Sequence, residues 1–176
     1  MNWIYWPILS VLLLLMIYDI HHMIHHAPVQ YHVGKGNIDE VKKYVKNGGN
    51  VNLKLMDDYS LLMISVENHR YGVARYLLES GADPNARNIR GETPLHKAVE
   101  SGDLKGVSLL LKYNADPEAG GDTRSLSPLS LAISRGDLSV VKRLIKNGAE
   151  VERHRIEIDT SDEIRDFLGT RLDRQQ

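Results

Sequence analysis

The chain has 176 residues, which is enough for one domain and an appendage. Its formal net charge is −1 at pH 7, so no global basic field draws it to nucleic acid or to acidic lipid. It contains no cysteine, which excludes disulfides, thiolate metal sites and a cysteine nucleophile.

The first element in chain order is an apolar segment without charge, Trp3–Tyr18. With Met1 and Ile20 included, about 20 residues rising about 1.5 Å each cover roughly 30 Å, enough to cross the core of a bilayer. Aromatic residues stand at both ends, as in interfacial belts: Trp3, Tyr5, Trp6 and Tyr18. We therefore predict a single-pass anchor that makes the lipid bilayer a partner of residues 1–20. A cleaved signal peptide is the alternative, but no Lys or Arg precedes the run and no clean small-x-small cleavage site follows it.

The membrane side of the domain that follows is left open by the flanking charges. The first basic side chain is Lys35, near the limit of the distance over which flanking Lys and Arg decide topology. Taken alone, this rule favours a cytoplasmic carboxy-terminal domain. We expect a membrane protein whose main domain can lie on either side of the bilayer.

Four of the eight histidines follow the anchor within six positions: His21, His22, His25 and His26. They form two i, i+4 pairs, so on a helix each pair could offer two imidazoles to a metal. No carboxylate is well placed to complete a site except Asp19, which lies near the membrane. We predict a polar juxtamembrane collar with no metal and no other cofactor. A metal- or pH-responsive membrane sensor built on these four histidines is the alternative, because imidazole titrates near neutral pH.

A template of about 33 residues recurs through the middle of the chain. Residues 91–117, GETPLHKAVESGDLKGVSLLLKYNADP, resemble an ankyrin repeat throughout, with that family's Thr-Pro-Leu-His at Thr93–His96. The template recurs in 59–85 and 126–152, and a degenerate first copy occupies 27–52. The predicted organisation has three parts: an anchor and histidine-rich collar at 1–26; four repeats at 27–153, divided into 27–54, 55–87, 88–120 and 121–153; and a C-terminal capping helix at 154–176.

The second helix of each copy carries apolar residues at i, i+3, i+6 and i+7, which form one stripe. The four stripes are Ile38, Val41, Tyr44 and Val45; Tyr71, Ala74, Leu77 and Leu78; Leu104, Val107, Leu110 and Leu111; and Leu138, Val141, Leu144 and Ile145. One helix pair cannot bury such a stripe alone, whereas stacked neighbours can. We predict an all-α ankyrin-repeat solenoid of helix-turn-helix repeats with short β-turn fingers, preceded by a single N-terminal hydrophobic helix.

The helix ends and the carboxy terminus fit this template. The residues expected in the left-handed conformation are Gly36, His69, Gly102 and Gly136 after the first helices, and Gly48, Gly81, Asn114 and Gly148 after the second. The resemblance implies that His96 bonds to backbone across the repeat, a bond that Met63 and Ser130 lose in the second and fourth copies. In TSDEIRDFLGTRL, Thr160 and Glu163 suit a capping box, and an apolar face follows, made of Ile164, Phe167, Leu168 and Leu172. We expect Phe167 to cover the open edge of the last repeat.

Catalysis has no motif to support it. The chain shows no nucleophile elbow, no paired acids at a glycosidase-like spacing and no redox motif, and GKGN at 34–37 lacks the rest of a phosphate loop. We therefore predict that the protein is not an enzyme and has no small-molecule substrate.

The resemblance implies a protein-binding surface made of finger tips and exposed first-helix positions. Mapped onto this chain, the partner-binding positions are Met56, Asp57, Tyr59, Glu67, Asn68, Arg87, Ile89, Arg90, Glu92, Glu100, Ser101, Arg124, Leu126 and Arg135. Interface hot spots favour aromatic and Arg side chains. The expected hot spots are therefore Tyr59, Arg87, Ile89, Arg90 and Arg124.

These observations predict a membrane-tethered interaction module that binds, sequesters or inhibits another protein, and that does not bind nucleic acid. The resemblance suggests a small anchored or exported bacterial protein, in the inner membrane, with its repeats either cytoplasmic or periplasmic. Immunity to a toxin or effector is one role that such proteins have, and it is kept as an alternative. The histidine-based sensor is the other.

Overall fold

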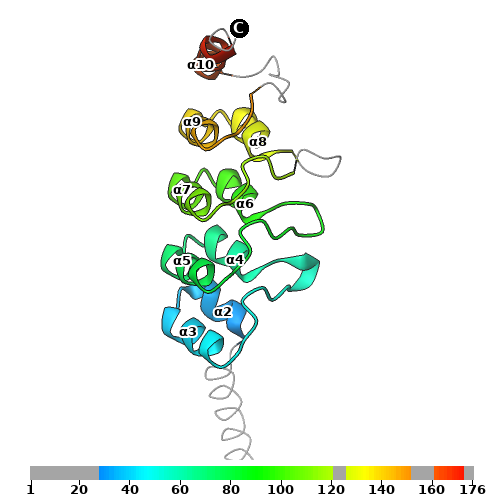
Figure 1. Cartoon of the computed structure of the whole chain (residues 1–176), viewed down its shortest axis with the longest axis vertical. Helices are drawn as coiled ribbons and strands as arrows, with labels where there is room; N and C mark the ends of the chain where they lie inside the picture. The colour runs from blue at the N-terminus through cyan, green and yellow to red at the C-terminus, as the bar shows by residue number, and fades with distance from the viewer. Residues whose placement is uncertain (1–27, 121–125, 152–160, 173–176) are drawn as a thin grey trace, which may run out of the picture.

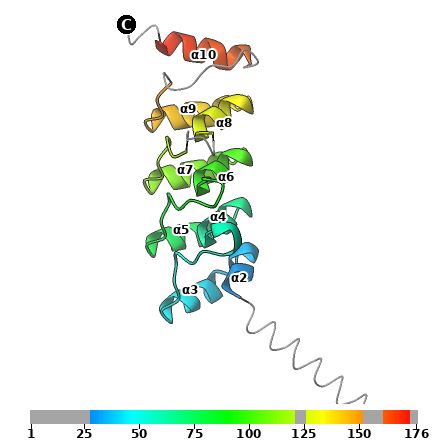
Figure 2. The same ribbon diagram turned by 90° about the vertical axis from the view of Figure 1, so that its right-hand side faces the viewer.

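The computed structural model describes residues 28–120, 126–151 and 161–172, and it stacks helical hairpins along one axis (Figures 1 and 2). One layer, the inner helices, consists of α2 (Val29–Lys35), α4 (Leu61–Glu67), α6 (Pro94–Glu100) and α8 (Pro128–Ser134). The other layer, the outer helices, consists of α3 (Ile38–Lys46), α5 (Tyr71–Glu79), α7 (Leu104–Lys112) and α9 (Leu138–Lys146). A short 3-10 helix, η1 (Met56–Asp58), forms the tip of the second finger, and α10 (Asp162–Leu172) ends the stack.

The described residues contain no strand, only an isolated antiparallel bridge between Lys54 and Ser60 at the base of the second finger. Figure 1 shows the loops between hairpins projecting as fingers from the side of the inner helices. Within the ranges that the structure describes, the predicted all-helical solenoid of helix-turn-helix repeats is confirmed. The predicted N-terminal hydrophobic helix and the histidine collar lie outside the described residues, as does the loop 121–125.

The hairpins form because their turns are occupied by residues that tolerate positive φ. All eight predicted positions have it: Gly36 (82°), His69 (56°), Gly102 (64°), Gly136 (72°), Gly48 (82°), Gly81 (91°), Asn114 (62°) and Gly148 (102°). Histidine and asparagine are among the few residue types with side chains that adopt this region. The two non-glycine exceptions therefore keep the same turn as the other repeats.

The core lies between the two layers and is built from the predicted stripes. The second stripe position is fully buried in every outer helix, at Val41, Ala74, Val107 and Val141. The inner helices bury Leu62, Leu95 and Leu129 against these residues. Because each hairpin covers its neighbour, the core continues through the stack.

Polar side chains between successive turns fix how one repeat sits on the next. The amide of Asn52 donates to the carbonyl of Gly81 over 3.1 Å and accepts the backbone N–H of Asp83 over 2.8 Å. Asn85 repeats this pattern one repeat later, and the carboxylate of Glu118 accepts a backbone N–H at the next interface. These bonds hold the fingers in one row.

The carboxy-terminal helix packs on the last repeat much as predicted. Ile164 and Leu168 are fully buried, whereas Phe167 is half-buried and its ring lies 5.3 Å from the ammonium of Lys142. Ile164 and Leu168, more than Phe167, therefore cover the open edge of the last repeat.

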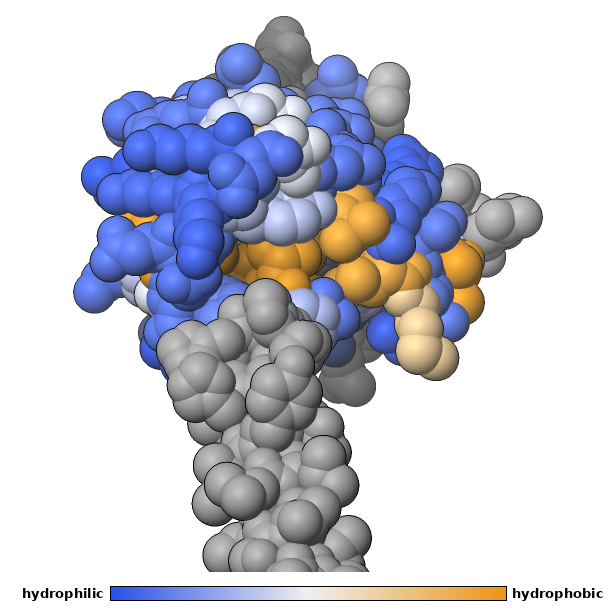
Figure 3. Space-filling view, turned by 90° about the horizontal axis from the view of Figure 1, so that it is seen from below, coloured by the Kyte–Doolittle hydropathy of each residue, from blue (hydrophilic) through white to orange (hydrophobic). Residues whose placement is uncertain are grey.

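At the opposite end of the stack, apolar side chains lie between the polar surfaces of the outer helices and of the fingers (Figure 3). No helix within the described ranges is long and apolar enough to span a bilayer.

Candidate functional site

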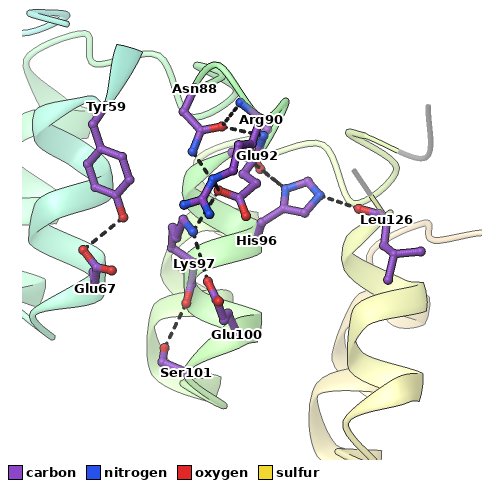
Figure 4. A network of polar contacts seen from close by, with 11 residues as sticks. Tyr59, Glu67, Asn88, Arg90, Glu92, His96, Lys97, Glu100, Ser101 and Leu126 are labelled. Carbon is purple, nitrogen blue, oxygen red and sulfur yellow. Dashed lines mark hydrogen bonds and ion pairs between the residues drawn. The ribbon is translucent and has the colours of Figure 1, made fainter. Parts of the chain in front are cut away.

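A groove of about 420 Å³ lies where the fingers meet the inner helices of the third and fourth repeats. Its lining residues are Ile89, Arg90, Glu92, His96, Glu100, Leu126 and Leu131. Five of these were predicted from the sequence as partner-binding positions, and His96 and Leu131 were not. Figure 4 shows that the polar members converge from the third finger and from one face of α6.

His96 ties the two sides of the groove together. Its Nδ1 accepts the backbone N–H of Thr93 over 3.0 Å, and its Nε2 donates to the carbonyl of Leu126 in the next repeat over 2.8 Å. The imidazole is only 3% exposed. Burial lowers the pKa of His96, and the Leu126 carbonyl opposes this only in part. The predicted bond across the repeat is confirmed, and it joins the third repeat to the fourth finger.

Gly120 shows how closely the chain passes over His96. Its φ is +93°, and a Cβ placed there would lie 2.8 Å from the imidazole Nε2. Only glycine fits this position without moving the histidine. Gly120 itself therefore lies directly against the wall of the groove.

Glu92 and Lys97 form the centre of an ion network beneath the third finger. The ammonium of Lys97 lies 2.9 Å from the Glu92 carboxylate and 3.0 Å from that of Glu100. Glu92 also accepts the amide of Asn88 over 2.7 Å and the guanidinium of Arg90 over 3.2 Å. Burial raises the pKa of Glu92, but the hydrogen bonds from Asn88 and Lys97 and the neighbouring cations outweigh it, so the pKa lies below its ordinary value. The carboxylate therefore stays ionised.

Lys97 is 5% exposed, which is unusual for a lysine. Burial lowers its pKa, but the bonds to Glu92 and Glu100 outweigh this effect and raise the pKa above its ordinary value. The equivalent inner-helix positions in the neighbouring repeats are Ile64 and Leu131. Lys97 is not among the positions predicted from the sequence, although an alignment of the repeats places a lysine in this apolar column.

Tyr59 belongs to the same cluster rather than to the open tip of its finger. Its hydroxyl donates to Glu67 over 3.0 Å, and Lys97 lies 6.0 Å from the centre of its ring. Burial, the hydrogen bond to Glu67 and nearby carboxylates raise the pKa of Tyr59. The ring is half-buried, so a partner would meet one side of it.

Three large apolar side chains remain exposed at the fingers. Met56 is 89% exposed, Ile89 is 58% exposed and Leu126 is 59% exposed. The backbone N–H of Ile89 donates to the carbonyl of Asp57 over 3.0 Å, so the second and third fingers touch. All three side chains were predicted as partner-binding positions, and Ile89 and Leu126 border the groove.

The remaining predicted positions surround this centre. Glu67 and Asn68 lie at the end of α4, Ser101 follows α6, and Arg135 follows α8. Arg87 is exposed on the finger side. Arg124 lies outside the described residues. Whether these positions bind a partner stays a prediction.

The described residues contain no group of three or more His, Asp or Glu side chains arranged to hold a metal ion. The four candidate histidines of the collar, at 21, 22, 25 and 26, lie outside these residues. The groove itself contains a neutral buried imidazole and carboxylates already held by Lys97, Arg90 and Asn88. This arrangement suits contact with another molecule better than transfer of a proton.

Comparison with known families identifies the array. A family model described as "Ankyrin repeats (3 copies)" matches residues 86–155, and one described as "Ankyrin repeats (many copies)" matches residues 44–98. Together they span 44–155, which is more than half of the chain. The chain belongs to the ankyrin-repeat proteins. Such repeats are in general protein-binding modules rather than enzymes. A groove lined by apolar and charged side chains is consistent with that general role.

Similar proteins share the ankyrin array over a small part of their length. The protein fem-1 homolog A-like of Mus musculus is 44% identical over 63 residues, 36% of this chain and 10% of that protein. Palmitoyltransferase Hip14 of Drosophila melanogaster is 39% identical over 85 residues, 47% of this chain and 13% of that protein. NF-kappa-B inhibitor alpha of Rattus norvegicus is 45% identical over 49 residues, 28% of this chain and 16% of that protein.

The names of these relatives differ in kind, since one is a transferase and another is an inhibitor. The chain spans only 10% to 16% of their lengths, so the similarity concerns the ankyrin repeats and not one shared activity. The three proteins come from animals, and the bacterial origin and the N-terminal anchor of this chain stay predictions.

Proposed function

We propose that this ankyrin-repeat protein is a membrane-tethered binding module that holds, sequesters or inhibits a partner protein. The partner binds the concave face, which we define as the fingers together with the exposed side of the inner helices. The membership of the family supports the binding role. The uncharged segment Trp3–Tyr18, which lies outside the described residues, supports the tether by its length and its flanking aromatic residues.

The exposed pair Ile89 and Leu126, at the edge of the groove, carries this proposal. Both side chains are more than half exposed, whereas the aliphatic residues of the stripes are buried or half-buried. Covering a large aliphatic side chain stabilises an assembly by roughly 1.5–3 kcal/mol. A groove lined by such side chains and rimmed by charged ones has the anatomy of a protein-binding surface.

We expect a photoreactive amino acid at Ile89 to crosslink a partner in native membranes, and the same residue at Lys105 on the outer face of α7 not to. The partner, identified by mass spectrometry and purified, is then titrated with the full-length protein. Ile89→Glu is expected to weaken binding about thirtyfold, because it places a charge in an apolar contact worth about 2 kcal/mol.

Lys105→Glu is the matched control, since it also changes charge at an exposed position, and it should alter the dissociation constant less than about twofold. Equal weakening by the two variants, or crosslinking from Lys105 alone, would place the binding surface elsewhere on the molecule.

The tether has its own test. Removing residues 1–20 should move the protein from the membrane pellet to the supernatant, because no described helix could replace the lost span. Circular dichroism should show that the repeats stay folded. Retention of the truncated protein in the pellet after a high-salt wash would contradict the tether and leave the binding role untouched.

A further inference from the structure

The groove has an apolar interior and two rims that differ in charge. Ile89, Leu126 and Leu131 supply the apolar lining. The finger rim carries Arg90, and the helix rim carries Glu100 (Figure 4). A bound segment therefore meets different charges on its two sides.

The charges within the site leave the helix rim negative. The ammonium of Lys97 neutralises part of the negative charge of Glu92 and Glu100. Because Lys97 is only 5% exposed, it presents little positive charge to a partner. Arg90 is paired with Glu92. Within the described part of the chain, the carboxylate of Glu67 has the Tyr59 hydroxyl as its partner and no cation.

The contacts of Tyr59 bring these carboxylates together. Its hydroxyl donates to Glu67 over 3.0 Å, and the ammonium of Lys97, which lies 2.9 Å from Glu92 and 3.0 Å from Glu100, is 6.0 Å from the centre of the Tyr59 ring. Burial raises the pKa of its hydroxyl most, and the hydrogen bond to Glu67 follows. The charges of Glu67, Glu92 and Glu100 add to the increase, although they come from three different segments. A cation placed between Glu67 and Glu100 would thus interact with both.

The same row of the inner helices limits where that cation can bind. Glu67 and Glu100 occupy equivalent positions in the second and third repeats, one period of the array apart. Basic side chains stand beyond both ends of this pair: Lys35 is the last residue of α2 and Arg135 follows α8, each one position after the residue equivalent to the two glutamates. On the finger side, the positive charge of Arg87 lies close enough to His96 to lower the pKa of its imidazole. Among the described residues, the middle of the helix rim is therefore the place where a basic group is favoured.

Resting on the proposed function, we propose that the groove receives a protein segment with one aliphatic side chain and a Lys or Arg close to it. The aliphatic group fills the space between Ile89, Leu126 and Leu131. The basic group lies against the exposed carboxylate of Glu100, which is 57% exposed, and against Glu67. Such a contact orients the segment across the groove, because the reversed orientation would bring the basic group to Arg90.

Selection of peptides tests this assignment without knowledge of the natural partner. The full-length protein, in detergent micelles, is used to select random dodecapeptides by display, in parallel with the Glu67→Gln/Glu100→Gln double variant. We expect the wild-type pool to be enriched in an aliphatic residue followed or preceded within a few positions by Lys or Arg. The enrichment of Lys and Arg should fall about fivefold or more in the double variant.

Glu40→Gln/Glu79→Gln is the matched control, because it removes two exposed carboxylates from the outer helices, one of which also accepts a tyrosine hydroxyl. It should leave the pool unchanged. An acidic consensus, a basic consensus insensitive to Glu67→Gln/Glu100→Gln, or no enrichment would overturn the assignment.

Ile89→Glu separates this failure from that of the proposed function. If an acidic or uncharged consensus binds the wild type but not Ile89→Glu, the concave face still binds protein and only the basic specificity is wrong. If selected peptides bind Ile89→Glu as well as the wild type, both the specificity and the concave-face proposal fail.

Discussion

Replacing His96 by alanine is expected to lower the free energy of unfolding by about 3 kcal/mol. The imidazole is 3% exposed and bonds the backbone N–H of Thr93 and the carbonyl of Leu126. Alanine leaves both backbone groups without their partner and opens a cavity between the third repeat and the fourth finger. Denaturant unfolding followed by circular dichroism measures the change.

His32→Ala is the control, since it removes a half-buried histidine from α2 that bonds only the side chain of Asn37 within the same repeat. We expect a loss below about 1 kcal/mol for this variant. If His96→Ala were as mild as His32→Ala, the bond across the repeat would contribute little to the array.

The same histidine makes stability depend on pH. Burial holds the pKa of His96 below 6.5, so the unfolded chain binds more protons than the folded one as the pH falls below that value. Its contribution is complete above about pH 6.5 and decreases as the pH falls towards the folded pKa. His96→Ala should therefore flatten the stability curve just below pH 6.5.

The array of hairpins could be predicted from sequence because its determinants are local and repeated. A left-handed turn needs one residue that tolerates positive φ, and His69 and Asn114 meet this need at 56° and 62° as glycine does elsewhere. The stripe on each outer helix follows from spacing alone. Neither inference requires knowledge of distant contacts.

The positions that line the groove were only partly predictable. Ile89 and Leu126 follow from their place in the fingers, and the structure brings both to the edge of the groove. The orientation of Tyr59 does not follow, because its hydroxyl turns towards Glu67 on the next helix rather than outward. The second finger also differs, since Asp57 and Asp58 both adopt positive φ, at 59° and 57°.

Lys97 shows why the electrostatics of a site are harder to predict than its outline. A lysine on a helix is usually solvated, even where the neighbouring repeats have apolar residues. Here it is buried because Glu92 reaches it from the finger and Glu100 from the next turn of α6. The burial depends on where the finger folds back, and that depends on tertiary contacts.

Glu92→Ala is expected to lower the free energy of unfolding by about 2–3 kcal/mol. Breaking a buried ion pair costs about 3–5 kcal/mol, and the 21% exposure of the Glu92 side chain reduces this cost through solvent screening. The cost arises because Lys97 stays almost buried with only the 57% exposed Glu100 as its carboxylate, and because Asn88 and Arg90 lose their shared partner. Denaturant unfolding at pH 7 measures it.

Glu100→Ala provides the matched control, because it removes the other carboxylate from Lys97 at a position that is 57% exposed, and it should cost less than about 1 kcal/mol. The double variant Glu92→Leu/Lys97→Leu should be less destabilised than Glu92→Ala, since Ile64 and Leu131 already fill the equivalent position of Lys97 in adjacent repeats. Equal losses from Glu92→Ala and Glu100→Ala would contradict a central role for Glu92.

Acid titration separates the charge of Glu92 from its packing. Its pKa is lowered in the folded chain from 4.5, so its stabilising effect is complete above that value and is lost as the pH falls through the folded pKa. Glu92→Gln keeps the shape of the side chain but has no charge to lose, and its unfolding free energy should fall less steeply below about pH 4.5 than that of the wild type.

Because Lys97 and Arg90 both depend on the Glu92 carboxylate, acid should also release the two cations that keep the finger against α6. The groove is therefore expected to lose its binding of selected peptides over the same pH range, and binding that survives there would show that the network does not hold the groove in shape.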